Sequence, residues 1–314
     1  MRKHLPYHLG LIIPCALIIA NGLTTYFSVI LFGSERSRKV FLVAYVAVWV
    51  SYGLAIFVKP GYTDGSQHHD GMYVECTKCH KPKPERAHHC RVCRRCVLQM
   101  DHHCPWTENC VGHNNMGHFM RFLVSAALLN AYGVYRTAAF LIYLFQHWRF
   151  RHRILPNNTR IWLASLGLVG DFFVMLTLSV LVLRVLMDCF QGQTQIENWE
   201  RDRVRTLHRK RLAPKTEFPF DVGLVSNLET FFGGFPYDWL LPWGKAKGNG
   251  HSFPKLFPTT ERWPPKDSAE VQGHEYYRAD RWINFDGETL RDFGVDEGTA
   301  DPDNIPLSEF RRRA

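Results

Sequence analysis

The stretch CTKCHKPKPERAHHCRVCRRCVLQMDHHCPWTENC, residues 76–110, contains seven of the nine cysteines of this 314-residue chain. Its C-x-x-C pairs lie at 76/79 and 90/93. A tight turn between the two cysteines of such a pair directs both thiolates at one metal ion, about 2.3 Å from each sulfur. Two closed tetrahedral zinc sites need eight ligands, which six cysteines and two histidines would supply. One cysteine is then left over for chemistry.

The possible metal ligands are the cysteines and histidines of this stretch and the histidine that follows it. In order they are Cys76, Cys79, His80, His88, His89, Cys90, Cys93, Cys96, His102, His103, Cys104, Cys110 and His113. Spacing alone does not choose between the adjacent histidines at 88/89 or at 102/103. A disulfide-stapled extracellular domain is the alternative, but such a scaffold has no need of so many histidines.

Four apolar runs lie outside this stretch, although the mean hydropathy of −0.20 is that of a soluble protein. Residues 9–32 and 40–58 contain no charged residue, and further runs cover residues 119–145 and 161–187. Each reaches the roughly 18–20 residues that cross about 30 Å of hydrocarbon. Four such runs argue against buried helices of a soluble domain. We predict an all-α integral membrane protein with four transmembrane helices and a small zinc-binding domain, residues 76–119, between the second and third.

Basic residues predict the orientation. They are more frequent in the N-terminal segment 1–8, in the segment between the second and third spans, and in the C-terminal region 188–314. By the positive-inside rule these three parts are expected in the cytosol, where thiols are kept reduced and bind zinc. The net charge of +9 then fits contact with anionic lipid. Nucleic acid is not an expected partner, because the basic residues border membrane spans and no recognition-helix spacing is present.

Two ionisable residues lie within the predicted spans. Arg136 and Asp171 come to depths that differ by only about 6 Å, counted at 1.5 Å per helical residue. Charges at membrane depth are costly unless they are paired. We therefore expect an ion pair between these two residues.

The string Asp101–Cys104, DHHC, is followed by Pro-Trp and preceded by the pattern C-x-x-C, HC-x-x-C-x-x-C. Residues 76–119 thereby resemble the cysteine-rich domain of the DHHC family of protein S-acyltransferases, also called palmitoyltransferases. The four-span layout of that family agrees with the hydropathy pattern. Within the family, the chain most resembles the fungal members that are located in the endoplasmic reticulum. Arg311–Arg313 would fit an arginine-type retention signal.

The resemblance implies two structural zinc ions. The first site would consist of Cys76, Cys79, His89 and Cys96, and the second of Cys90, Cys93, His103 and Cys110. Closed sites of this kind have no open position for water and stabilise a domain too small to build much core. Cys104 is left without a metal.

The resemblance also implies the chemistry. Cys104 would attack the thioester of palmitoyl-CoA, carry the acyl group and pass it to a cysteine of a membrane-associated protein. His102 would be the base that forms the thiolate, and Asp101 would orient it. We expect Lys83, Arg86 and His88 to hold the phosphates of CoA.

One face of the third span could enclose the acyl chain, since each buried methylene contributes about 0.8 kcal/mol. The residues at helical spacing on this face are Phe119, Phe122, Ala126, Leu129 and Gly133. Ordinary helix packing is the alternative.

Three elements outside the zinc domain also resemble the family. Lys59-Pro60-Gly61 has lysine where the family has aspartate. Thr194–Glu197 has Gln195 where the family has the threonine that contacts the catalytic aspartate, which puts this contact in doubt. The segment around Asn227 and Phe231 resembles the C-terminal aromatic element of the family.

Two other functions use similar residues. A membrane-anchored RING-like ubiquitin ligase would have interleaved zinc sites, and a zinc scaffold would keep the metal ligands without catalysis. Neither needs Asp-His-His before a spare cysteine. A thiol oxidoreductase would need its C-x-x-C pairs free of metal.

Overall fold

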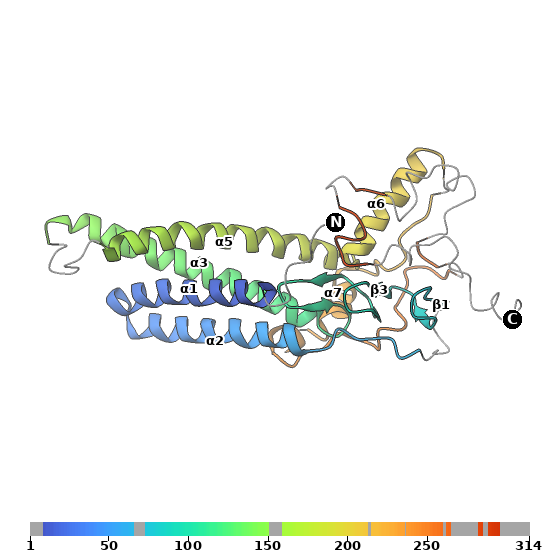
Figure 1. The fold of residues 1–314 in the computed structure, drawn as a ribbon, viewed down its shortest axis with the longest axis horizontal. Helices are drawn as coiled ribbons and strands as arrows, with labels where there is room; N and C mark the ends of the chain where they lie inside the picture. The colour runs from blue at the N-terminus through green and yellow to red at the C-terminus, as the bar shows by residue number, and fades with distance from the viewer. Residues whose placement is uncertain are drawn as a thin grey trace, which may run out of the picture. The chain divides into compact units, whose positions relative to one another are not determined.

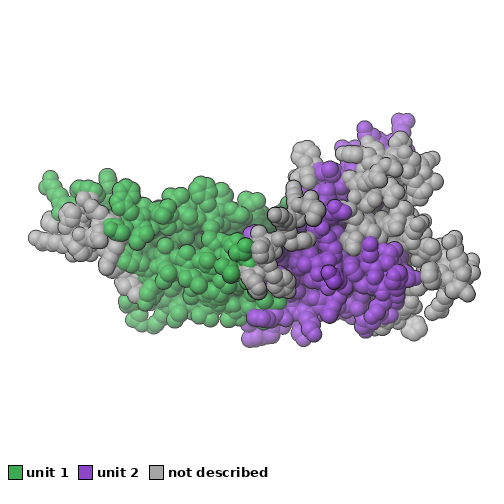
Figure 2. Space-filling view, in the orientation of Figure 1, with its two compact units in different colours: residues 1–56, 118–184 green, residues 57–117, 185–314 purple. Residues whose placement is uncertain are grey.

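The computed structural model of the chain describes residues 9–65, 73–150, 159–212, 215–235, 237–259, 262–264, 282–284 and 288–295. The N-terminal segment 1–8 and the basic end at Arg311–Arg313 lie outside these residues. The chain divides into two compact units, which Figure 2 shows in green and purple. Unit 1 contains residues 1–56 and 118–184, and unit 2 contains residues 57–117 and 185–314.

Unit 1 is built from four long apolar helices, which lie side by side in Figure 1. They are α1 (Leu9–Phe32), α2 (Glu35–Phe57), α3 (Met116–Gln146) and α5 (Thr159–Phe190), and the ends of the last three belong to unit 2. Each is long and apolar enough to cross a membrane. The predicted fold class, a helical protein with four membrane spans, is thus confirmed. Helix α2 begins before the predicted apolar run because its charged first turns also adopt helical structure.

Neutral polar side chains connect the helices of unit 1. Asn21 Nδ2 on α1 donates to Asn130 Oδ1 on α3 at 3.1 Å. The hydroxyl groups of Ser28 and Thr137 lie 3.1 Å apart between the same two helices. Hydrogen bonds of this kind hold helices together where no hydrophobic driving force acts between them.

The expected ion pair between Arg136 and Asp171 does not form, and that prediction was wrong. The Asp171 carboxylate instead accepts a hydrogen bond from Thr24 Oγ1 at 3.0 Å. Arg136 Nε has no hydrogen-bond partner among the described residues. The predicted depth of Asp171 agrees with the structure, in which its carboxylate lies close to Gly133 on α3. Depth alone does not decide which side chain of α1 or α3 contacts that carboxylate.

Unit 2 begins with three short antiparallel hairpins, which the sequence analysis did not predict. Their strands are β1 (Tyr73–Glu75), β2 (Pro82–Pro84), β3 (His88–Cys90), β4 (Arg95–Val97), β5 (His102–Cys104) and β6 (Asn109–Val111). Each strand pairs with the next one along the chain, β1 with β2, β3 with β4 and β5 with β6. The remaining elements described are a 3-10 turn η1 (Trp148–Phe150) and the helices α6 (Gln195–Arg209), α7 (Leu224–Phe232) and α8 (Tyr237–Leu240).

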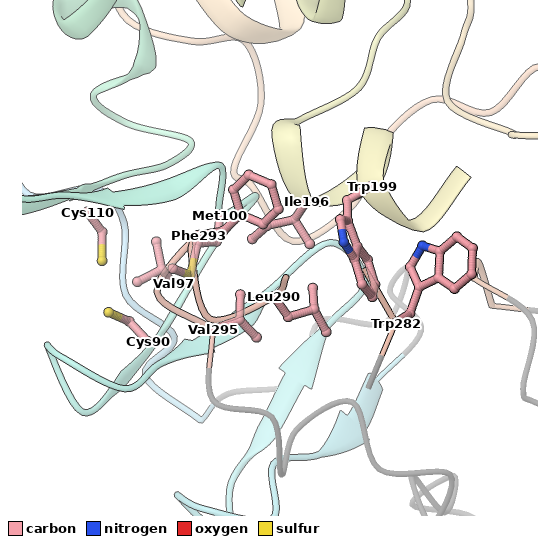
Figure 3. Packing of buried hydrophobic residues seen from close by; sticks show 10 residues of the cluster. All are labelled: Cys90, Val97, Met100, Cys110, Ile196, Trp199, Trp282, Leu290, Phe293 and Val295. Carbon is pink, nitrogen blue, oxygen red and sulfur yellow. The ribbon is translucent and has the colours of Figure 1, made fainter. Parts of the chain in front are cut away.

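The hydrophobic core of unit 2 brings together distant parts of the sequence. Figure 3 shows Val97 and Met100 of the hairpin region beside Ile196 of α6. Leu290 and Phe293, from near the end of the chain, join the same cluster. The cysteine-rich segment therefore packs against apolar side chains of α6 and of residues near the end of the chain. A segment of this size is too small to bury a sufficient core by itself.

Candidate active site and zinc centres

The first predicted zinc site comes together in the structure. His89 Nδ1 lies 3.6 Å from Cys76 Sγ, 3.1 Å from Cys79 Sγ and 3.8 Å from Cys96 Sγ. The sulfurs of Cys79 and Cys96 are 3.8 Å apart. Ligands placed tetrahedrally at zinc bond lengths of about 2.0–2.3 Å are separated by about 3.5–3.8 Å. These donors therefore fit a zinc ion.

The second site has the same geometry. His103 Nδ1 lies 3.7 Å from Cys90 Sγ and 3.5 Å from both Cys93 Sγ and Cys110 Sγ. The sulfurs of Cys93 and Cys110 are 3.4 Å apart. The structure thus brings together the two sets of four donors that the resemblance implies.

Strand register explains why these residues meet. His89 pairs with Cys96 across β3 and β4, and His103 pairs with Cys110 across β5 and β6. Directly paired residues of an antiparallel hairpin have side chains on the same face. These two hairpins thereby each contribute one histidine and one cysteine to a site, and the C-x-x-C pairs 76/79 and 90/93 supply the other two ligands of the first and second site.

The C-x-x-C turns have the backbone conformation that a metal site needs. The Cys93 N–H donates to the sulfur of Cys90 at 3.3 Å. The residue after each pair lies in the left-handed region, with φ of 52° at His80 and 54° at Arg94. Neither residue is glycine, so the conformation is held by the turn around the thiolates rather than by local preference.

Four histidines among the possible ligands lie outside both clusters. His80, His88 and His102 are not donors to either site. His113 makes other contacts, with Nδ1 2.9 Å from Gln99 Oε1 and Nε2 3.3 Å from the Gly248 carbonyl oxygen.

The predicted catalytic residues form a connected group in unit 2. His102 Nδ1 lies 2.8 Å from Asp101 Oδ2. The side chains of His102 and Cys104 are also hydrogen-bonded. Cys104 is only 3% exposed and belongs to neither metal cluster. An acid, a base and a thiol thus follow one another in one chain of contacts.

The electrostatics favour an ionised pair. Burial opposes a charge on His102, but the hydrogen bonds to Asp101 and Cys104 outweigh it and raise the pKa of His102 to about 10. Burial also opposes the thiolate, yet the hydrogen bond and positive charge of His102 lower the pKa of Cys104 below its ordinary value. Proton transfer from Cys104 to His102 is therefore favourable in this site.

Two groups that the sequence analysis missed also stabilise the thiolate. Hydrogen bonds from the Thr107 side chain and the Trp106 backbone lower the pKa of Cys104 further. The Cys104 carbonyl oxygen, 3.4 Å from the Thr107 hydroxyl, is the alternative acceptor for the same proton. The turn after the DHHC string could have indicated these contacts, since hydroxyl side chains often bond to the backbone of a nearby turn.

The backbone of helix α6 supplies the contact to Asp101 that the presence of Gln195 had put in doubt. The backbone N–H of Gln195 donates to Asp101 Oδ1 at 2.8 Å. The N-cap residue Thr194 and Glu197 form a capping box, in which Thr194 Oγ1 accepts from the Glu197 N–H and Glu197 Oε2 accepts from the Thr194 N–H. Asp101 therefore sits at the positive N-terminal end of a helix, and the side chain at position 195 is not needed for this contact.

The Lys59 departure has a similar explanation. The Lys-Pro-Gly segment contacts the zinc domain through its backbone. The Pro60 carbonyl oxygen accepts from the Asn114 N–H at 3.0 Å, and the Gly61 carbonyl oxygen accepts from the Leu98 N–H at 2.9 Å. Gly61 has a φ of 93°, which glycine adopts without strain. The Lys59 side chain is exposed.

The structure gives Arg86 a role other than the predicted contact with CoA. Its Nε and Nη2 donate to the two carboxylate oxygens of Glu197 at 2.6 and 2.7 Å, and Nη2 also donates to the Gly192 carbonyl. The guanidinium lies over the rings of Phe220 and Phe253, 4.5 and 4.6 Å from their centroids. This geometry does not support a contact between Arg86 and a phosphate.

The other two basic candidates differ in exposure, since Lys83 is buried and His88 is half-buried. Burial and repulsion from Arg262 lower the pKa of Lys83 to about 8. Burial and the positive charges of Lys83, Arg262 and Arg86 lower the pKa of His88 well below its ordinary value. A phosphate could reach Lys83 only if the residues that cover it moved, whereas His88 is half-buried and partly open to solvent.

Comparisons with known proteins agree with this site. The family model described as DHHC palmitoyltransferase matches residues 71–202. Palmitoyltransferase PFA4 of Yarrowia lipolytica is 36% identical, over 92% of this chain and 96% of its own length. Palmitoyltransferase PFA4 of Kluyveromyces lactis is 34% identical over 92% of this chain and 97% of its own length, and palmitoyltransferase ZDHHC15 of Rattus norvegicus is 34% identical over 59% of this chain and 51% of its own length. With two zinc-binding clusters and a separate Cys104 thiol beside His102, the chain therefore belongs to the DHHC palmitoyltransferase family.

Proposed function

We propose that this protein S-palmitoyltransferase moves a long-chain acyl group from palmitoyl-CoA, through an acyl-enzyme on Cys104, to cysteines of membrane-associated proteins. The observation that carries the proposal is the position of Cys104. It lies outside both metal clusters and is hydrogen-bonded to His102, which Asp101 holds. A thiol activated by an adjacent, oriented base is the arrangement that nucleophilic catalysis needs.

In the first half-reaction His102 takes the proton of Cys104. The thiolate attacks the carbonyl carbon of the acyl-CoA thioester, a new bond forms to the Cys104 sulfur, and the CoA sulfur leaves and receives the proton from His102. In the second half-reaction a cysteine of the target protein gives its proton to His102 and attacks the acyl-enzyme. Cys104 then leaves as the thiolate beside the protonated His102, which restores the starting ion pair. Both steps exchange one thioester for another of similar energy, so no ATP is required.

The zinc ions would have a structural role. The donor sets Cys76, Cys79, His89, Cys96 and Cys90, Cys93, His103, Cys110 leave no ligand position for water, and a bound zinc would hold the hairpins together. Cys104 follows His103 directly, so the second site also positions the nucleophile.

Cellular placement is part of the proposal. Zinc-binding thiols and a CoA donor both suit the cytosolic face of the membrane, and the charge bias of the flanking segments supports that orientation. We propose the endoplasmic reticulum as the compartment. The half-buried His88, and Lys83 after movement of the residues that cover it, stay as proposed contacts of the CoA phosphates.

Labelling with alkyne-tagged palmitoyl-CoA tests the proposal. The purified wild type should acquire a label that neutral hydroxylamine releases, and Cys104→Ser should not. Cys15→Ser and Cys189→Ser are matched controls, because these two cysteines also lie outside the metal clusters. Both control variants should still be labelled at Cys104. Zinc content near two per chain would show that each variant is folded. An unlabelled wild type with two zinc ions would favour the scaffold function, and equal labelling of Cys104→Ser would exclude this nucleophile.

A further inference from the structure

Unit 2 exposes a group of large apolar side chains that its own core does not use. Around helices α7 and α8 the exposed fractions are 55% for Leu224, 62% for Val225, 66% for Phe235, 73% for Tyr237 and 68% for Trp243. We call these five residues the α7–α8 surface. A concentration of exposed apolar side chains in so short a segment, residues 224–243, indicates an interaction site.

The framework beneath this surface is well ordered by specific contacts. Trp239 Nε1 donates to the Gly233 carbonyl oxygen at 2.8 Å, and its ring meets that of Phe235 edge-on at 4.9 Å between centroids. Asp238 Oδ2 accepts from the Gly234 N–H at 2.9 Å. Gly233 has a φ of 87°, and a Cβ there would come within 2.0 Å of the Lys245 carbonyl oxygen. The exposed rings are thus presented by a closed turn.

A direct hydrogen bond ties α7 to the end of a membrane span. Asn227 Nδ2 donates to the carbonyl oxygen of Phe190, the last residue of α5, at 2.8 Å, and both residues belong to unit 2. The Asn227 side chain also bonds to Asp221 and to the Val222 N–H. Asn227 is only 1% exposed, so the bond is an internal part of unit 2. Helix α7 is therefore held at the level where the apolar helix α5 ends.

The chemistry of the surface fits a lipid headgroup region. Tryptophan and tyrosine are enriched at membrane–water interfaces, where one end of the ring system is dry and the other wet. Lys245 is exposed next to the surface, and Lys247 is exposed while paired with Glu229 at 2.6 Å. Apolar side chains with lysines at the margin are typical of segments that lie in the plane of an anionic leaflet.

We infer that the α7–α8 surface is immersed in the membrane leaflet at which α5 ends. The inference rests on the hydrogen bond between Asn227 and Phe190, on the exposure of the five apolar side chains and on their chemical composition. The inference goes beyond the acyl transfer proposed above and does not depend on it. The surface would hold unit 2 at the bilayer surface in addition to the covalent links to the spans.

Lipid-attached quenchers test this inference on the full chain. A fluorescent amino acid is placed at Tyr237 in one protein and at Arg205 in another, and both are put into nanodiscs of phosphatidylcholine and phosphatidylserine with spin-labelled lipids. Arg205 is the matched control, because its side chain is 61% exposed in the same unit but lies on α6. We expect quenching at 237 at least several-fold stronger than at 205, and two zinc ions per chain in both proteins.

Equal or weak quenching at both positions would overturn the inference. Weak quenching at 237 together with two copies per nanodisc by mass photometry would instead assign the surface to a contact between copies of the chain. Weak quenching with single copies would leave a protein partner as the occupant. The triple change Phe235→Ser, Tyr237→Ser and Trp243→Ser gives an independent check, since it should raise hydrogen exchange of 224–243 in nanodiscs and leave that of α6 unchanged.

Discussion

At the scale of single residues, the site depends on what each neighbour of Cys104 does to its proton. Burial alone would keep the thiol neutral. His102 reverses this effect, and it does so because Asp101 fixes its Nδ1 and leaves the other ring nitrogen for the thiol. Asp101 is thus placed to orient His102 and to stabilise its positive charge.

We predict that Asp101→Asn slows acylation of Cys104 by about 10²–10⁴-fold, the range that a positioned acid–base group contributes. The asparagine amide has no negative charge, and it no longer holds His102 in the correct tautomer. The measurement is the rate of hydroxylamine-sensitive labelling by palmitoyl-CoA. The control is Asp202→Asn, whose side chain is 43% exposed on α6 and should leave the rate unchanged. A normal rate in Asp101→Asn would remove Asp101 from the mechanism.

The reactivity of Cys104 should extend to lower pH than that of an ordinary thiol. Its pKa is lowered and that of His102 is raised to about 10, so the thiolate–imidazolium pair persists between these two values. The rate of alkylation by iodoacetamide should therefore stay high below the usual thiol pKa of about 8.5 and fall only at more acidic pH. In Asp101→Asn the midpoint should move up towards 8.5. A wild-type midpoint at or above 8.5 would contradict the ion pair.

At the scale of elements, the start of α6 acts as a support for the catalytic group. Its capping box, its backbone N–H at Gln195 and the Arg86–Glu197 pair all lie within the four residues 194–197. The pair is buried, with side-chain exposures of 2% and 4%. Removing one partner of such a pair leaves an uncompensated charge inside the protein.

We expect Glu197→Gln to destabilise unit 2 by about 3–5 kcal/mol and to slow acylation through the weakened support of Asp101. Thermal unfolding monitored by tryptophan fluorescence would measure the first effect. Glu217→Gln is the control, since Glu217 is 66% exposed and a surface pair contributes only about 0–1 kcal/mol. Equal melting temperatures for the two variants would show that the buried pair is not a support.

The third span supplies an element-scale test of acyl-chain length. Ala126 is 5% exposed and faces the interior of unit 1, and we propose that this face borders the acyl chain. Gly133 is less suitable, because a Cβ there would lie 2.5 Å from Thr25 Oγ1, and so the space beside it is already filled.

Ala126→Phe should shift the preference towards shorter acyl donors, as measured by competition between C14- and C18-CoA in the labelling assay. Leu128→Phe is the matched control, because Leu128 is 64% exposed and faces away from this interior. No difference between the two variants would favour ordinary packing over an acyl tunnel.

At the scale of the whole molecule, the two units should respond differently to loss of metal. The donors of both sites lie in unit 2, whose core also contains Trp199 and Trp282. Most of the length of the four long helices belongs to unit 1, which is held by its own polar and apolar contacts.

Removal of zinc by a strong chelator should therefore abolish labelling and shift tryptophan emission to the red, while most of the helical circular dichroism remains. Readdition of two zinc ions per chain should restore both signals. A parallel loss of helical signal would show that the membrane helices also depend on the metal sites.

The class of fold and the presence of a metal-binding segment could be predicted from local physics, since an apolar run of sufficient length can cross the bilayer and a C-x-x-C turn aims two thiolates at one point. Cys104 as nucleophile came from the family resemblance and stays a prediction. The choice of His89 and His103 came from the family resemblance, and the strand register agrees with it.

Only the tertiary structure decided which partners these residues meet. The contact from Gln195 N to Asp101 joins positions 94 residues apart, and the use of Arg86 by Glu197 joins positions 111 apart. The absence of an Arg136–Asp171 pair and the exposure of Tyr237 and Trp243 depend in the same way on which helix faces meet. Spacing along the chain carries no information on such contacts, because they are set by packing between segments whose relative rotation the local sequence does not specify.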